Sequence, residues 1–117
     1  MKILFLDDDE NRIEAFKKKT SPGWDITITK TAKETIDVLK NNNSWNYVFL
    51  DHDLGGQVFV DSDREDCGME VVRWITRNRP EIELIIVHSW NEPASKRMIS
   101  DLEMAGYNVV YSPFGMS

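Results

Sequence analysis

The sequence predicts a single α/β domain built around a mainly parallel β-sheet. Short apolar runs alternate with longer amphipathic segments, which is the pattern of β-α-β units. The runs Ile3–Leu6, Tyr47–Leu50 and Leu84–His88 are almost continuously apolar, which indicates strands buried on both faces. A length of 117 residues with 41% apolar content fits one compact domain over residues 1–117 and leaves no room for a second.

Each element follows from the local pattern. The predicted strands are Ile3–Leu6, Asp25–Lys30, Tyr47–Leu50, Leu84–His88 and Asn108–Tyr111. Segments with apolar residues three to four apart are predicted to be helices: Asn11–Thr20, Ala32–Asn41, Gly68–Arg79 and Ala94–Ala105. Pro80 cannot continue the third helix, Pro93 suits the first turn of the fourth, and Gly106 can adopt the left-handed conformation that closes it.

Two regions depart from this alternation. Residues 55–67 (GGQVFVDSDREDC) form a long acidic connection, which we interpret as a solvated loop and a candidate lid. After the last predicted strand only SPFGMS remains, so a fifth helix is not expected. Its absence would uncover apolar residues on one sheet face, one of Ile85 or Ile86 and one of Val109 or Val110, and predicts a homodimer or a partner there.

The charge balance limits the classes of partner. Lys and Arg number 14 against 20 Asp and Glu, a net charge of −6, which argues against binding long nucleic acids or anionic membranes. Cys67 is the sole cysteine, which excludes an intramolecular disulfide and a zinc site built from several cysteines. The sequence shows neither a signal peptide nor an apolar stretch long enough to cross a membrane, so a cytoplasmic location is expected.

Carboxylates follow two of the predicted strands at the edge where ligands bind in open parallel sheets. Asp7, Asp8 and Asp9 follow the first strand, and Asp51, His52 and Asp53 follow the third. Several carboxylates placed together repel one another, and a hard divalent cation with oxygen ligands would neutralise them. The sequence therefore predicts a site for Mg²⁺ (or Mn²⁺). The segment DDDE can alternatively cap a helix, since acidic residues favour a helix N-terminus.

These motifs carry a resemblance to a known family. ILFLDDDENR resembles the opening of response-regulator receiver domains, and YVFLDHDLGG with GMEVVRWI resembles their phosphoacceptor strand and third helix. The resemblance covers nearly the whole chain and implies a flavodoxin-like (receiver) three-layer α/β fold with strand order 2-1-3-4-5. It implies that Asp7 and Asp8 bind the metal, that Asp51 is the phosphoacceptor, and that the backbone carbonyl of Asp53 completes the metal coordination.

The departures from the receiver pattern change the expected function. Ser112 stands where receivers have a lysine that pairs with the phosphoryl group, which makes a plain phospho-switch questionable. The residues His88, Ser89 and Asn91, together with the D-H-D tip, are similar to a divergent branch, the cyclic-phosphate processing receiver domains. That resemblance implies a metal-dependent site acting on a cyclic nucleotide or another phosphodiester.

The residues themselves suit this chemistry. Asp7, Asp8 and Asp51 can hold the metal, His88 can act as acid or base near neutral pH, and Ser89 and Asn91 can donate hydrogen bonds to phosphate oxygens. Each also has a structural interpretation. His88 can simply bond a neighbouring carboxylate, and Asn91 can cap the fourth helix. His52 points away from Asp51 by strand alternation, which favours a structural role.

Three functions therefore stay open. The first is a metal-dependent phosphoesterase that acts on cyclic phosphates, with His88, Asp51, Ser89 and Asn91 as catalytic residues. The second is a signalling module in which Asp51 is phosphorylated. The third is a protein that binds a phosphate-containing small molecule or a partner without catalysis.

Overall fold

The structure is a computed structural model that describes residues 1–42, 44–52 and 67–113. Its elements are β1 (Lys2–Leu6), α1 (Glu10–Lys18), β2 (Asp25–Thr29), α2 (Ala32–Asn41), β3 (Ser44–Leu50), α3 (Gly68–Asn78), β4 (Glu81–Val87), α4 (Glu92–Met104) and β5 (Val109–Tyr111). The five strands form one parallel sheet of order β2-β1-β3-β4-β5. The predicted three-layer α/β fold and strand order are confirmed.

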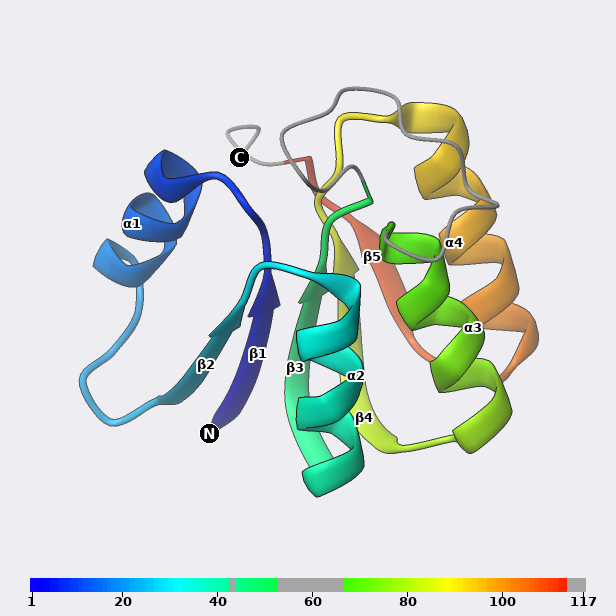
Figure 1. The fold of residues 1–117 in the computed structure, drawn as a ribbon, viewed down its shortest axis with the longest axis horizontal. Coiled ribbons are helices and arrows are strands. Elements are labelled where there is room, and N and C mark those ends of the chain that lie inside the picture. Colours follow the sequence, from blue (N-terminus) through cyan, green and yellow to red (C-terminus); the bar gives the residue numbers. More distant parts are fainter. Residues whose placement is uncertain (43, 53–66, 114–117) are drawn as a thin grey trace.

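Two layers of helix enclose the sheet (Figure 1). Helix α1 covers one face, while α2, α3 and α4 lie on the other. Alternation along β1 explains the division, because Ile3 and Phe5 pack toward α1 whereas Leu4 and Leu6 join the larger core under α2 to α4. All strands run in one direction, so their carboxyl ends share the upper edge of the sheet in Figure 1.

The starts of β3 and β4 were predicted three residues too late. The structure begins β3 at Ser44 and β4 at Glu81, and these residues pair in register, as do Trp45 and Ile82. The segment Glu81–Glu83 alternates exposed, buried and exposed residues, so only the central Ile82 enters the core. A prediction from continuous apolar runs misses such a half-buried strand end.

The described residues contain four helices and no fifth, as the sequence indicated. Val109 packs against the larger core, while Val110 is 44% exposed and Tyr111 is 38% exposed. The expectation that Ile85 or Ile86 would be uncovered is wrong, because Ile85 is fully buried and Ile86, on the opposite face by alternation, is only 8% exposed. The predicted dimer or partner on this face stays a prediction. No helix in the described ranges has the length and apolar character needed to cross a membrane.

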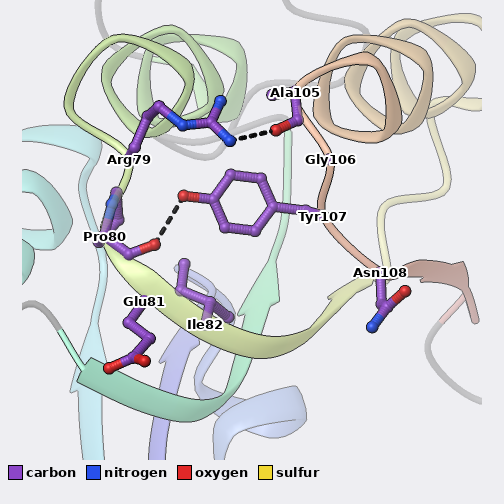
Figure 2. A pocket seen from close by; sticks show the side chains of 8 residues that line it. All are labelled: Arg79, Pro80, Glu81, Ile82, Ala105, Gly106, Tyr107 and Asn108. Carbon is purple, nitrogen blue, oxygen red and sulfur yellow. Dashed lines mark hydrogen bonds between the residues drawn. The ribbon is translucent and has the colours of Figure 1, made fainter.

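A small cavity of about 240 Å³ lies at the amino-terminal edge of the sheet, between the starts of β4 and β5 (Figure 2). Arg79 ends α3 in the left-handed conformation, with φ 54°. Its Nη2 donates to the Ala105 carbonyl at 2.6 Å, and its guanidinium lies 5.8 Å from the Tyr107 ring centroid. The Tyr107 hydroxyl donates to the Pro80 carbonyl at 2.6 Å. These contacts tie the end of α3 to the end of α4.

Replacement of Arg79 separates the side-chain contacts from the backbone strain. Arg79→Ala removes the contacts of the Arg79 side chain with the Ala105 carbonyl and the Tyr107 ring but keeps a Cβ at positive φ. We therefore expect the free energy of unfolding to fall by about 1–2 kcal/mol. Arg79→Gly loses the same contacts but relieves the strain, so it should be the more stable of the two variants. Urea unfolding measures both values. A glycine variant less stable than the alanine variant would contradict this account.

Candidate functional site

The carboxylates at the ends of β1 and β3 lie together. β1 and β3 are neighbours in register, with Phe5 opposite Phe49, so Asp7 and Asp51 emerge side by side. One carboxylate oxygen each from Asp7, Asp8 and Asp51 lies within 4.8 Å of the other two. Asp7 is fully buried and Asp51 is 5% exposed. The fourth predicted metal ligand, Asp53, lies outside the described residues.

The third aspartate of the run has a different place. Asp9 caps α1, and its carboxylate accepts a hydrogen bond from the Arg12 backbone N–H at 3.1 Å. The backbone N–H of Asp9 in turn donates to Asp7 Oδ1 at 2.9 Å. The helix cap predicted for the DDDE segment is confirmed at Asp9, while Asp7 and Asp8 line a cluster that could hold a metal.

Arg12 supplies the positive charge of the cluster. Its Nε and Nη2 donate to the two carboxylate oxygens of Asp7 at 2.7 and 2.8 Å, and Nη2 lies 3.5 Å from Asp51 Oδ2. These contacts raise the pKa of Arg12, the hydrogen bond to Asp7 most of all. The sequence interpretation missed Arg12. A basic side chain in the first turn of a helix opposes the helix dipole, and this unfavourable placement was the available signal.

Asp51 is held in an environment that disfavours its charge. Burial, followed by the negative charge of Asp7, raises the pKa of Asp51 to about 7, and the nearby Arg12 only partly opposes this rise. Its Oδ1 accepts a hydrogen bond from the His52 backbone N–H at 2.9 Å. One guanidinium therefore does not compensate three close carboxylates. The donor set, made of hard carboxylate oxygens, fits Mg²⁺ or Mn²⁺.

Gly68 allows the start of α3 to approach this strand end. A Cβ at Gly68 would lie 1.9 Å from the backbone oxygen of Asp51, a distance that no side chain tolerates. The Gly68 N–H donates to the His52 carbonyl at 2.9 Å. The close packing of α3 against residues 51 and 52 thus depends on glycine at this position.

His88 lies beneath Asp7. It is 3% exposed, and its ring stacks on Phe5 with centroids 5.0 Å apart. Nε2 lies 3.0 Å from the Leu6 carbonyl, which can only accept a hydrogen bond, so the ring proton is assigned to Nε2. Nδ1 lies 3.6 Å from Asp7 Oδ2. Burial lowers the pKa of His88 to about 4, although Asp7 opposes this shift, so the imidazole is neutral at pH 7.

Ser89 and Asn91 form the connection into α4. The Asn91 carboxamide oxygen accepts from the Ala94 N–H at 3.3 Å, which confirms that Asn91 caps the helix. Ser89 Oγ accepts from the Asn91 N–H at 3.1 Å. The Ser89 carbonyl accepts from Ser95 Oγ and from the Tyr111 hydroxyl. The predicted phosphate contacts of Ser89 and Asn91 stay predictions.

His52 is fully buried and is the centre of a second set of polar residues, together with Asn91 and Cys67. Asn91 Nδ2 lies 3.5 Å from His52 Nδ1, and the His52 side chain also hydrogen-bonds Cys67 at the start of α3. Burial alone would raise the pKa of the Cys67 thiol, but the bond from His52 and bonds from the helix backbone lower it. His52 therefore has the structural environment that strand alternation predicted. The hydrogen bond from the His52 backbone N–H to Asp51 Oδ1 joins His52, Asn91 and Cys67 to the acidic cluster.

Comparisons with known proteins agree with this fold. A family model described as the cyclic-phosphate processing receiver domain matches residues 2–104. A comparison with curated proteins gave no match. The signal receiver domain of a Vibrio parahaemolyticus protein has a TM-score of 0.70 at 16% identity, covering 99% of this chain and 79% of that chain. A response regulator from Colwellia psychrerythraea has a TM-score of 0.69 at 16% identity, covering 99% and 86%. The Mn²⁺-bound form of response regulator Rcp1 has a TM-score of 0.59 at 16% identity, covering 99% and 82%.

The electrostatics of Asp51 predict a pH-dependent effect of its replacement in metal-free protein. The folded chain keeps a proton on Asp51 up to about pH 7, whereas the unfolded chain releases it near 3.8, so the contribution of Asp51 to stability falls as the pH rises between these values. Asp51→Asn cannot ionise. We expect it to be more stable than the original protein by about 1–3 kcal/mol at pH 8, with a smaller gain at pH 5 and near equality only below about pH 4.

Urea unfolding in a chelating buffer between pH 5 and pH 8 measures this difference. The lowered pKa of His88 gives the opposite trend, because stability from the neutral imidazole is lost as the pH falls, but both proteins share that contribution. A stability difference that does not change with pH would contradict the electrostatic account of Asp51.

Proposed function

Because the chain belongs to the cyclic-phosphate processing receiver domain family, we propose that its acidic cluster binds Mg²⁺ or Mn²⁺ and that the pocket hydrolyses a small cyclic phosphate ester. The observation that carries this proposal is the convergence of Asp7, Asp8 and Asp51 at the carboxyl edge of the sheet. Three buried or half-buried carboxylates repel one another unless a cation compensates them.

The cation would be held by the carboxylate oxygens of Asp7, Asp8 and Asp51. When bound, a divalent cation neutralises phosphate oxygens and lowers the pKa of a water molecule beside it. In the hydrolysis, the oxygen of water bonds to phosphorus and one phosphorus–oxygen ester bond of the ring breaks. The released alkoxide takes up a proton, and the product is a phosphate monoester.

His88 acts through Asp7 in this proposal. Its ring is 3% exposed and its Nδ1 lies 3.6 Å from Asp7 Oδ2, so it packs against that carboxylate and does not contact a ligand. The hydrogen bond from Nε2 to the Leu6 carbonyl fixes the ring and its tautomer. Because burial lowers its pKa to about 4, the ring is neutral at pH 7 and adds no positive charge beside Asp7. His88 is thus a positioning residue.

Two features at the same edge suit a phosphate ester with an attached base. The Asn91-capped start of α4 presents the positive end of the helix dipole, which favours a phosphate oxygen. Trp90 is 56% exposed between Ser89 and Asn91, and an exposed indole can stack on a nucleobase.

Turnover of defined compounds tests the proposal. The protein is incubated with Mg²⁺ or Mn²⁺ and either 2′,3′-cyclic or 3′,5′-cyclic nucleotides, and phosphorus NMR follows the appearance of phosphate monoester. Asp51→Asn should lower turnover at least ~100-fold, since it weakens the cation site. His88→Gln retains a donor toward the Leu6 carbonyl and should cost roughly 10–100-fold in metal affinity or turnover.

Asp37→Asn is the matched control, because this exposed carboxylate on α2 lies outside the cluster. It should leave metal affinity and turnover unchanged. Product formation that neither Asp51→Asn nor His88→Gln reduces would rule out the proposed site. Tight binding of a nucleotide without product would instead favour a non-catalytic binding protein.

Phosphorylation of Asp51 is the alternative use of the same pocket. It is supported by the place of Asp51 after β3 and by the similarity of the fold to response regulators. Ser112 at the end of β5 is exposed and neutral, so no cation is offered from that strand end to a phosphoryl group. Intact-mass measurement after treatment with acetyl phosphate and Mg²⁺ distinguishes the two uses. A phosphoryl group added to Asp51, without hydrolysis of cyclic phosphates, would favour the signalling function.

A further inference from the structure

The acidic cluster contains a cationic side chain, Arg12, which contacts two of the carboxylates. Arg12 binds both oxygens of Asp7 through Nε and Nη2, and the same Nη2 lies 3.5 Å from Asp51. Among the described residues, Arg12 is the Arg or Lys side chain that forms ion pairs with both buried carboxylates, Asp7 and Asp51. Its position follows from the cap of α1, because Asp9 binds the Arg12 backbone N–H.

The outer edge of this guanidinium faces away from Asp7. Nη1 lies 3.7 Å from Asp9 Oδ2, beyond hydrogen-bond length, and the Arg12 side chain is 29% exposed. A guanidinium has five N–H donors in a planar fork that matches two phosphate oxygens. The Arg12 fork can therefore bind an anion once its bonds to Asp7 are released.

The charges of the site give Arg12 opposite effects on a metal and on a phosphate. Asp7, Asp8 and Asp51 with Arg12 sum to −2 when all are ionised, so a divalent cation brings the loaded site to zero. Without Arg12 the empty site would carry −3 and the loaded site −1. A cation is attracted more strongly to the more negative empty site, whereas a phosphodiester anion is repelled by a loaded site that stays negative.

We propose that Arg12 is a phosphate-binding residue of the pocket, whose guanidinium binds Asp7 in the metal-free protein and a phosphate oxygen of the ligand in the loaded one. The bidentate bond to Asp7 makes Arg12 a competitor of the metal for that carboxylate. Once the metal neutralises Asp7, the guanidinium becomes available to the anion. The identity of the anion as a phosphate ester rests on the proposed function, whereas the competition with the metal does not.

Calorimetric binding to matched variants tests both halves. Arg12→Met keeps the length of the side chain and removes the charge, and Arg12→Lys keeps the charge and removes the fork. Arg77→Met is the control, since it removes the same charge from an exposed position in the last turn of α3. Mn²⁺ is titrated first, and inorganic phosphate and 3′,5′-cyclic AMP are then titrated in saturating Mg²⁺. Circular dichroism verifies that each variant is folded.

Arg12→Met should bind Mn²⁺ roughly 10-fold tighter and both phosphate compounds at least ~10-fold more weakly than the original protein. Arg12→Lys should bind Mn²⁺ with near-original affinity and the phosphate compounds with intermediate affinity. Arg77→Met should change neither. Because the metal and phosphate affinities move in opposite directions, a general loss of structure cannot mimic the result.

The outcomes separate this inference from the proposed function. If Arg12→Met binds phosphate and cyclic AMP as the original protein does, or weakens Mn²⁺ binding, the role of Arg12 is wrong even when turnover is observed. If the predicted opposite shifts are found but no product forms, the proposed hydrolysis fails and the role of Arg12 stands. If the original protein binds neither Mn²⁺ nor phosphate, both proposals are overturned.

Discussion

The burial of Asp7 beside Asp51 is the constraint on which the carboxyl edge of this sheet depends. The parallel register of β1 and β3 brings the two carboxylates together, and neither has enough water around it to screen its charge. The raised pKa of Asp51 is the direct result.

Arg12 supplies the compensating positive charge, and His88 packs against Asp7 without adding charge. From α1, Arg12 binds Asp7 and approaches Asp51, at the cost of a positive charge near the start of a helix. From β4, His88 lies under Asp7 as a neutral ring fixed by the Leu6 carbonyl. The compensation is incomplete, and this incompleteness is what favours a divalent cation. A divalent cation would complete the charge balance that the protein alone leaves open.

The alternation of apolar runs and amphipathic segments predicted the strands, the helices and a mainly parallel sheet, whereas the resemblance to receiver domains implied the strand order. The sequence predicted Asp7, Asp8 and Asp51 because strand ends in a parallel sheet share one edge. It missed Arg12, because a pair between α1 and β3 arises only from the tertiary arrangement. Strand pattern could place His88 at the edge, but not beneath Asp7, because that depends on packing against Phe5. The starts of β3 and β4 were misplaced because one face of each start is exposed.

We propose that these carboxylates hold a divalent cation, which Arg12 partly replaces when the cation is absent. A crystal structure of the protein grown with Mn²⁺, with anomalous scattering to locate the metal, tests this most directly. We predict one anomalous peak at about 2.0–2.3 Å from side-chain oxygens of Asp7, Asp8 and Asp51, with the Arg12 fork drawn away from Asp7. The absence of a peak there at saturating Mn²⁺, with Arg12 still bound to both oxygens of Asp7, would contradict the account.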